Sequence, residues 1–157
     1  MKQKMIRTLL CIMVAMASLT VNAQVKAFEK YADMKNVSYV YISKYMLGMA
    51  SKTSMPSVPG VDTKSLASKL TGIQIISCES RGAQAKMKND VKNIIAKDKY
   101  ELMMQVNEDD SKVNIYHHIG KQQSAVIMQV DDDDELTILV FSGKFTLEDV
   151  MKMTESR

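Results

Sequence analysis

In the first half of the chain, apolar residues at helical intervals alternate with short runs of β-branched and aromatic residues. Phe28 and Tyr31 share the helical spacing, which predicts a helix over 25–34 that Asn36 ends. The stretch "VSYVYIS", 37–43, has the composition of a strand. The same criteria predict further helices over 44–50, 63–70 and 82–100 and a second strand over 72–80.

The second half of the chain shows alternation with a period of two instead. Strand-like runs are centred near Met104, Tyr116, Ile127 and Ile138, 11 or 12 residues apart, with turn residues in each gap. This spacing predicts four strands that fold back and forth as an antiparallel meander. Thr146 then stands where an N-cap residue would begin a C-terminal helix through "TLEDVMKM".

These patterns predict an α+β fold. We expect one sheet with a four-stranded antiparallel meander in the C-terminal half and helices packed mainly on one face, because their apolar stripes need a surface to bury against. The pattern leaves open how the first two strands join that sheet.

The N-terminus has the three parts of a signal peptide. Lys2, Lys4 and Arg7 form a basic head, an apolar stretch of secretory length follows, and small residues stand before Gln24. We expect cleavage after residue 23, a single α+β domain over 24–157, and export to the periplasm or cell envelope. The apolar stretch is too short for a transmembrane helix, so we expect no transmembrane segment after cleavage.

Cleavage would change the charge balance and the cysteine count. Three of the 21 basic residues lie in the signal peptide and all 18 acidic residues lie beyond it, which leaves 18 of each sign. A neutral chain lacks the basic surplus that nucleic-acid binding needs, so this class is excluded. Cys78 becomes the one remaining thiol, so no internal disulfide forms and packing must stabilise the fold.

Acidic residues are concentrated in two of the predicted turns. Alternate turns of a meander lie at the same end of the sheet, so we expect these carboxylates to gather there as a candidate binding edge. Three interpretations remain open: a hydrated turn, a contact for a basic partner, or a site for a cation such as Ca²⁺. The eight residues are Glu108, Asp109, Asp110, Asp131, Asp132, Asp133, Asp134 and Glu135.

Other candidate chemistry is weaker. His117 and His118 are adjacent in a strand, so they point to opposite faces and cannot share a metal; we expect one to be half-buried and hydrogen-bonded and the other exposed. Cys78 is expected to pack as a small apolar side chain.

Helical spacing of Met46 and Met49 favours core packing over a methionine-lined groove or a copper site. We expect core packing for Met103, Met104, Met151 and Met153 as well. The loop over 51–60 is either a plain connection or a lid over the sheet.

Three stretches resemble a family of small exported Bacteroidota proteins, the domain-of-unknown-function family 4252. They are "VSYVYISKYMLGM", "ELMMQVNEDDSKVNIYHH" and "ELTILVFSGKFTLEDVMKM". The resemblance implies membership of a family without an established activity, so it transfers no catalytic residue or cofactor. Similar proteins are often lipoproteins, but Cys11 stands in the middle of the apolar stretch rather than at its end.

We therefore expect an exported, non-enzymatic cell-envelope protein that acts as a binding module, with no catalytic residue, no metal and no cofactor. Its expected partner is an envelope protein. The alternative is a protein that binds a small ligand or Ca²⁺, and a small thiol-dependent enzyme is the third hypothesis.

Overall fold

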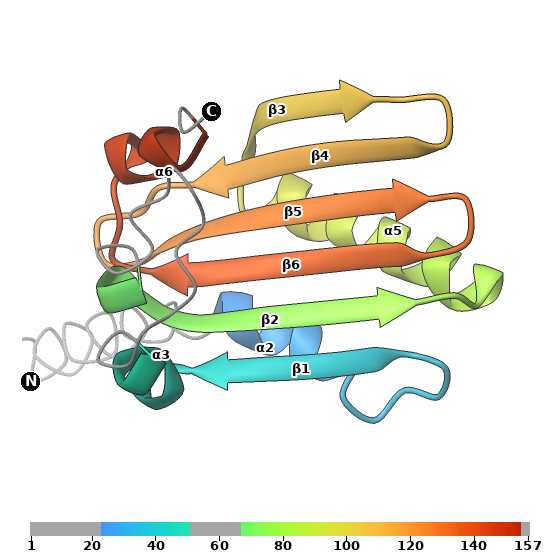
Figure 1. Cartoon of the computed structure of the whole chain (residues 1–157), viewed down its shortest axis with the longest axis horizontal. Helices are drawn as coiled ribbons and strands as arrows, with labels where there is room; N and C mark the ends of the chain where they lie inside the picture. The colour runs from blue at the N-terminus through green and yellow to red at the C-terminus, as the bar shows by residue number, and fades with distance from the viewer. Residues whose placement is uncertain (1–22, 51–66, 155–157) are drawn as a thin grey trace, which may run out of the picture.

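Six strands form one antiparallel sheet in the order β1-β2-β6-β5-β4-β3 (Figure 1). The computed structural model describes residues 23–50 and 67–154. The prediction of an α+β chain with a single antiparallel sheet is confirmed. The strands are β1 Ser38–Ser43, β2 Leu70–Cys78, β3 Glu101–Asn107, β4 Ser111–His118, β5 Ser124–Asp132 and β6 Leu136–Gly143.

The position of β2 joins the two halves of the chain. This strand pairs with β1 on one side and with β6 on the other, so the N-terminal strands extend the sheet at β6. The remaining strands pair in chain order, β3 with β4, β4 with β5 and β5 with β6. The β3–β4 and β5–β6 hairpins therefore have their turns at the same end of the sheet (Figure 1).

Four helices of seven or more described residues accompany the sheet: α2 Ala23–Glu29, α3 Lys44–Ala50, α5 Arg81–Lys97 and α6 Leu147–Thr154. The helix predicted over 25–34 ends earlier, at Glu29, because the next hydrogen bonds span three residues rather than four, as from Tyr31 N to Phe28 O. Asn36 does adopt a positive φ of 61°, but it does so after this turn. The backbone N–H of Met46 contacts Ser43 Oγ at 3.4 Å, so Ser43 caps α3.

One face of the sheet packs against α2 and α5, which lie behind it in Figure 1. Met87 and Val91 of α5 are buried there against Ile76 of β2 and Ile138 of β6. Successive residues of β2 alternate between buried and partly exposed, as the period of a strand requires. We call this the helix face.

An interaction between Tyr31 and Asp90 fastens the N-terminal segment to α5. The buried Tyr31 hydroxyl donates a hydrogen bond to Asp90, and Lys30 Nζ lies 2.7 Å from Asp90 Oδ2. Burial alone would raise the pKa of Asp90, but the hydrogen bonds from Lys30 and Tyr31 outweigh it and hold that pKa below its usual value. Burial, together with the Asp90 carboxylate, raises the pKa of Tyr31.

The opposite face, which we call the open face, carries a second and smaller cluster. Leu47 of α3 and Val150 of α6 meet Phe145, Ile115 and Val126 there. The helices are thus divided between the two faces, with α2 and α5 on one and α3 and α6 at one end of the other. The loop 51–60 and most of the helix predicted over 63–70 lie outside the described residues.

Candidate binding surface at the acidic end of the sheet

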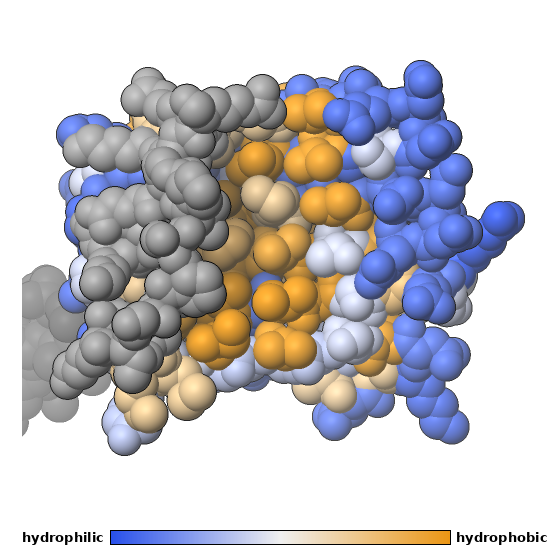
Figure 2. Space-filling model, in the orientation of Figure 1, coloured by the Kyte–Doolittle hydropathy of each residue, from blue (hydrophilic) through white to orange (hydrophobic). Residues whose placement is uncertain are grey.

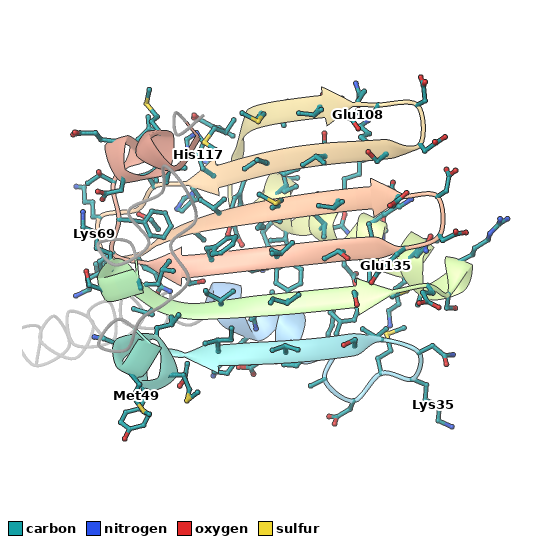
Figure 3. All side chains as sticks on the ribbon, in the orientation of Figure 1. Lys35, Met49, Lys69, Glu108, His117 and Glu135 are labelled. Carbon is teal, nitrogen blue, oxygen red and sulfur yellow. The ribbon has the colours of Figure 1, made fainter. Side chains whose placement is uncertain are left out.

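The two acidic turns lie side by side. A hydrogen bond from Glu108 N to Ser111 O closes the β3–β4 turn, and one from Asp132 N to Glu135 O closes the β5–β6 turn. The strand register places the two turns next to each other, because Ser111 at the start of β4 pairs with Asp132 at the end of β5. The structure therefore brings the eight predicted acidic residues together at one end of the sheet, which we call the acidic end; Figure 3 labels Glu108 and Glu135 there.

Most of these carboxylates face water. All of them are exposed except Asp131, which is partly buried. The ion pair that links the acidic end to a described base joins Asp131 Oδ2 to Lys88 Nζ of α5 at 2.7 Å. Within residues 23–50 and 67–154, no three His, Cys, Asp or Glu side chains converge as a metal site would require. Seven exposed carboxylates in two short turns make this end a strongly negative surface.

A cavity of about 490 Å³ opens beside the β5–β6 turn. Its walls come from the paired ends of β1 and β2 and from the segments that flank them. This cavity could not be predicted from the sequence, because it depends on the non-local pairing of Ser38 with Ser77. The lining residues are Asn36, Ser38, Ser77, Cys78, Glu79, Ser80 and Glu135.

The open face carries a row of apolar side chains that crosses the whole sheet. Each strand contributes one residue, and strand register aligns them as direct neighbours. Figure 2 shows apolar side chains on this face across the strands, beside the hydrophilic side chains of the acidic end. We call this row the apolar band; in sheet order it consists of Val40, Ile75, Leu139, Met128, Ile115 and Met104.

A second row separates the apolar band from the acidic end. It lies two residues further along each strand and mixes hydroxyl side chains with valines. The next row contains Ser111 and Asp132, so Asp132 projects from the same face as the apolar band. Side chains on the open face thus change from apolar to acidic along the strands. The intermediate row consists of Ser38, Ser77, Thr137, Val130, Val113 and Val106.

The two histidines lie on opposite faces, as predicted. His117 pairs with Val126 of the open face, whereas the ring of His118 lies 5.6 Å from that of Tyr100 in the helix-face cluster. The prediction that one of them is exposed is wrong, because both are partly buried. The expected hydrogen bond is also missing at one ring atom: His117 Nδ1 is buried without a partner, and Nε2 lies 3.9 Å from Glu101.

Cys78 packs as predicted. Its side chain is 3% exposed, and Sγ donates a hydrogen bond to the carbonyl of Ser80 at 3.3 Å.

The core-packing prediction is confirmed for Met87, which is buried, and for Met34 and Met128, which pack against the two clusters, but it is wrong for four other methionines. Met46 and Met49 are exposed because α3 turns Leu47 toward the sheet instead, and Met151 of α6 is also exposed. Met103 is partly buried against the open-face cluster, and Met104 belongs to the exposed edge of the apolar band. Met153 lies among side chains that the structure does not describe.

Comparison with known proteins identifies a family over most of the chain. Residues 31–153 match the family model described as "Domain of unknown function (DUF4252)". No curated protein and no solved structure matches the chain. Among the described residues, no helix has the length and apolar character to cross a membrane.

Proposed function

Because the chain belongs to this family of unknown function, we propose from its own surface that it is an exported, non-enzymatic protein of the cell envelope that binds another macromolecule. The acidic end of the sheet is the contact. Export follows from the signal-peptide pattern of residues 1–23. The binding role follows from the side-by-side placement of the two acidic turns.

That placement is the observation on which the proposal depends. Like charges in neighbouring turns repel one another, and the described residues supply one ion pair to this end, Lys88 with Asp131. A basic partner would remove the repulsion and gain attraction from several carboxylates at once. Such surfaces steer association and make it sensitive to salt.

Co-purification from the envelope fraction tests this proposal. We expect the tagged protein to begin at Gln24 by intact mass and to retain a partner at low salt. The double variant Asp132→Asn with Asp133→Asn should lose that partner, and raising the salt should release it from the unmodified protein. Glu29→Gln with Asp33→Asn removes the same charge from exposed positions in and after α2, so this control should retain the partner.

A protein that stays a solitary monomer in every envelope preparation would count against the proposal. So would a partner that both double variants retain equally well.

A further inference from the structure

Both faces of this sheet are apolar, although a sheet that stands in water on one side normally alternates apolar and polar residues. In β2, Ile76 is buried on the helix face, while Ile73 and Ile75 project from the other. The helix face has α5 across it, and the open face has α3 and α6 at one end. The apolar band overlaps that end cluster at Ile115 and Met128, and its other residues continue the apolar surface across the sheet, beside the acidic end (Figure 2).

Exposure increases toward the two edges of the apolar band. Val40 on β1 is 46% exposed and Met104 on β3 is 39% exposed, Ile75, Leu139 and Met128 in the centre are partly exposed, and Ile115 beside Met104 is buried. A continuous apolar strip of this kind on a protein surface marks an interaction site rather than a scatter of single exposed residues.

The dimensions of the apolar band fit one helix. Six strands spaced about 4.8 Å apart make the band about 24 Å long, which about 16 residues of α-helix would span. The row that contains Asp132 lies four residues along the strands from the band, about 13 Å away. A Lys or Arg on the flank of a helix about 10 Å across can reach that far.

Charge decides between this occupant and a second copy of the chain. The end of the sheet opposite the acids holds residues of both signs: Lys44, Lys121 and Lys144 follow strands that end there, Glu101 begins β3 there, and Glu148 lies in α6. That end of a second copy therefore offers no clear basic surplus. The exposed side of α5 is basic, with Arg81, Lys86, Lys92 and Lys97, but the apolar stripe of α5 is buried on the helix face and so cannot cover the apolar band of another copy. An acyl chain would bury the apolar band but would provide no positive charge to pair with the carboxylates.

We infer that the apolar band and the acidic end form one docking surface for a polypeptide helix that carries an apolar stripe and Lys or Arg along one flank. This rests on the proposed function and specifies the chemistry of its partner. The apolar stripe lies across the six strands, and the basic flank faces Asp132 and the two turns.

Two labelled 18-residue peptides of identical composition test the inference by fluorescence anisotropy with the purified protein. Both carry a leucine stripe; one places its lysines on a flank of the stripe, the other on the side opposite to it. The flank peptide should bind at least about tenfold more tightly. Leu139→Ser and Met104→Ser should each weaken it about tenfold, because each removes a buried apolar contact.

Leu102→Ser is the matched control for Met104→Ser. Leu102 is 53% exposed on the same strand, but it pairs with Tyr116 of the helix-face cluster and so projects from the opposite face. This variant should bind the flank peptide as the unmodified protein does. Circular dichroism melts of all variants should show that each is folded.

The inference is overturned if Met104→Ser and Leu102→Ser bind alike, or if the two peptides bind alike. It is also overturned if the unmodified protein is a dimer in sedimentation equilibrium and Leu139→Ser abolishes that dimer, because a second copy would then occupy the band. The same holds if the protein binds a fluorescent fatty acid and Leu139→Ser abolishes that binding. If Asp132→Asn with Asp133→Asn weakens binding and the band variants do not, the inference fails and the proposed function stands. If neither set has an effect, both fail.

Discussion

At the scale of single residues, the start of α6 shows how far local chemistry can be predicted from sequence. Thr146 and Asp149 cap the helix reciprocally: Asp149 N donates to Thr146 Oγ1 at 3.3 Å, and Thr146 N donates to Asp149 Oδ2 at 2.8 Å. The sequence predicted Thr146 as the N-cap residue of this helix. Lys69 completes it by pairing with the other Asp149 oxygen, and that contact, 80 residues away in the chain, was beyond prediction.

The acidity of Asp149 gives a prediction at the same scale. The hydrogen bond from Lys69, and after it that from the Thr146 backbone, lowers the pKa of Asp149 to about 2. A carboxyl group with a lowered pKa in the folded state stabilises the fold above its unfolded pKa of about 3.9 and ceases to do so as the pH falls through about 2. Urea unfolding should therefore show Asp149→Asn less stable than the unmodified protein at pH 7.

That difference should shrink as the pH falls below about 4, where Asp149 begins to gain its proton in the unfolded chain. Asp33→Asn, which changes an exposed carboxyl outside α6, serves as the control and should not show the same loss. A difference between Asp149→Asn and the unmodified protein that is constant from pH 7 to pH 2 would contradict this account of the cap.

At the scale of helices and strands, alternation and helical spacing predicted most of the elements but not their arrangement. β4 and β5 were predictable because their partners adjoin them in the chain. The insertion of β2 between β1 and β6 depends on pairing over long separations, which no local pattern records. The methionines show the same limit, because helical spacing cannot tell that Leu47 rather than Met46 turns toward the sheet.

The difference between the two faces gives a prediction about stability. Met87 of α5 is fully buried on the helix face, so Met87→Ala should lower the free energy of unfolding by about 2–5 kcal/mol. Met104 lies at the exposed edge of the apolar band, so Met104→Ala should change it by no more than about 0.5 kcal/mol. Urea unfolding followed by circular dichroism measures both, and equal losses would show that the apolar band is covered in the isolated protein.

At the scale of the whole molecule, the sheet has a helix across one apolar face and an acidic end beside the other. The gathering of Glu108 to Asp110 with Asp131 to Glu135 was predicted, because alternate turns of consecutive antiparallel strands must meet. The apolar band could not be predicted, since it becomes continuous only when β1 and β2 align with the later strands. The family to which the chain belongs has no known function, so a role for this protein is inferred from these two surfaces.

Site-specific photo-cross-linking in cells that export the protein tests the central claim most directly. A photoreactive amino acid would replace Met104 or Asp133 on the proposed docking surface, or Leu102, which projects from the opposite side of β3. We predict one and the same cross-linked polypeptide at Met104 and Asp133 and none at Leu102. Equal cross-linking at all three positions, or cross-linking at Leu102 alone, would contradict the assignment of this surface.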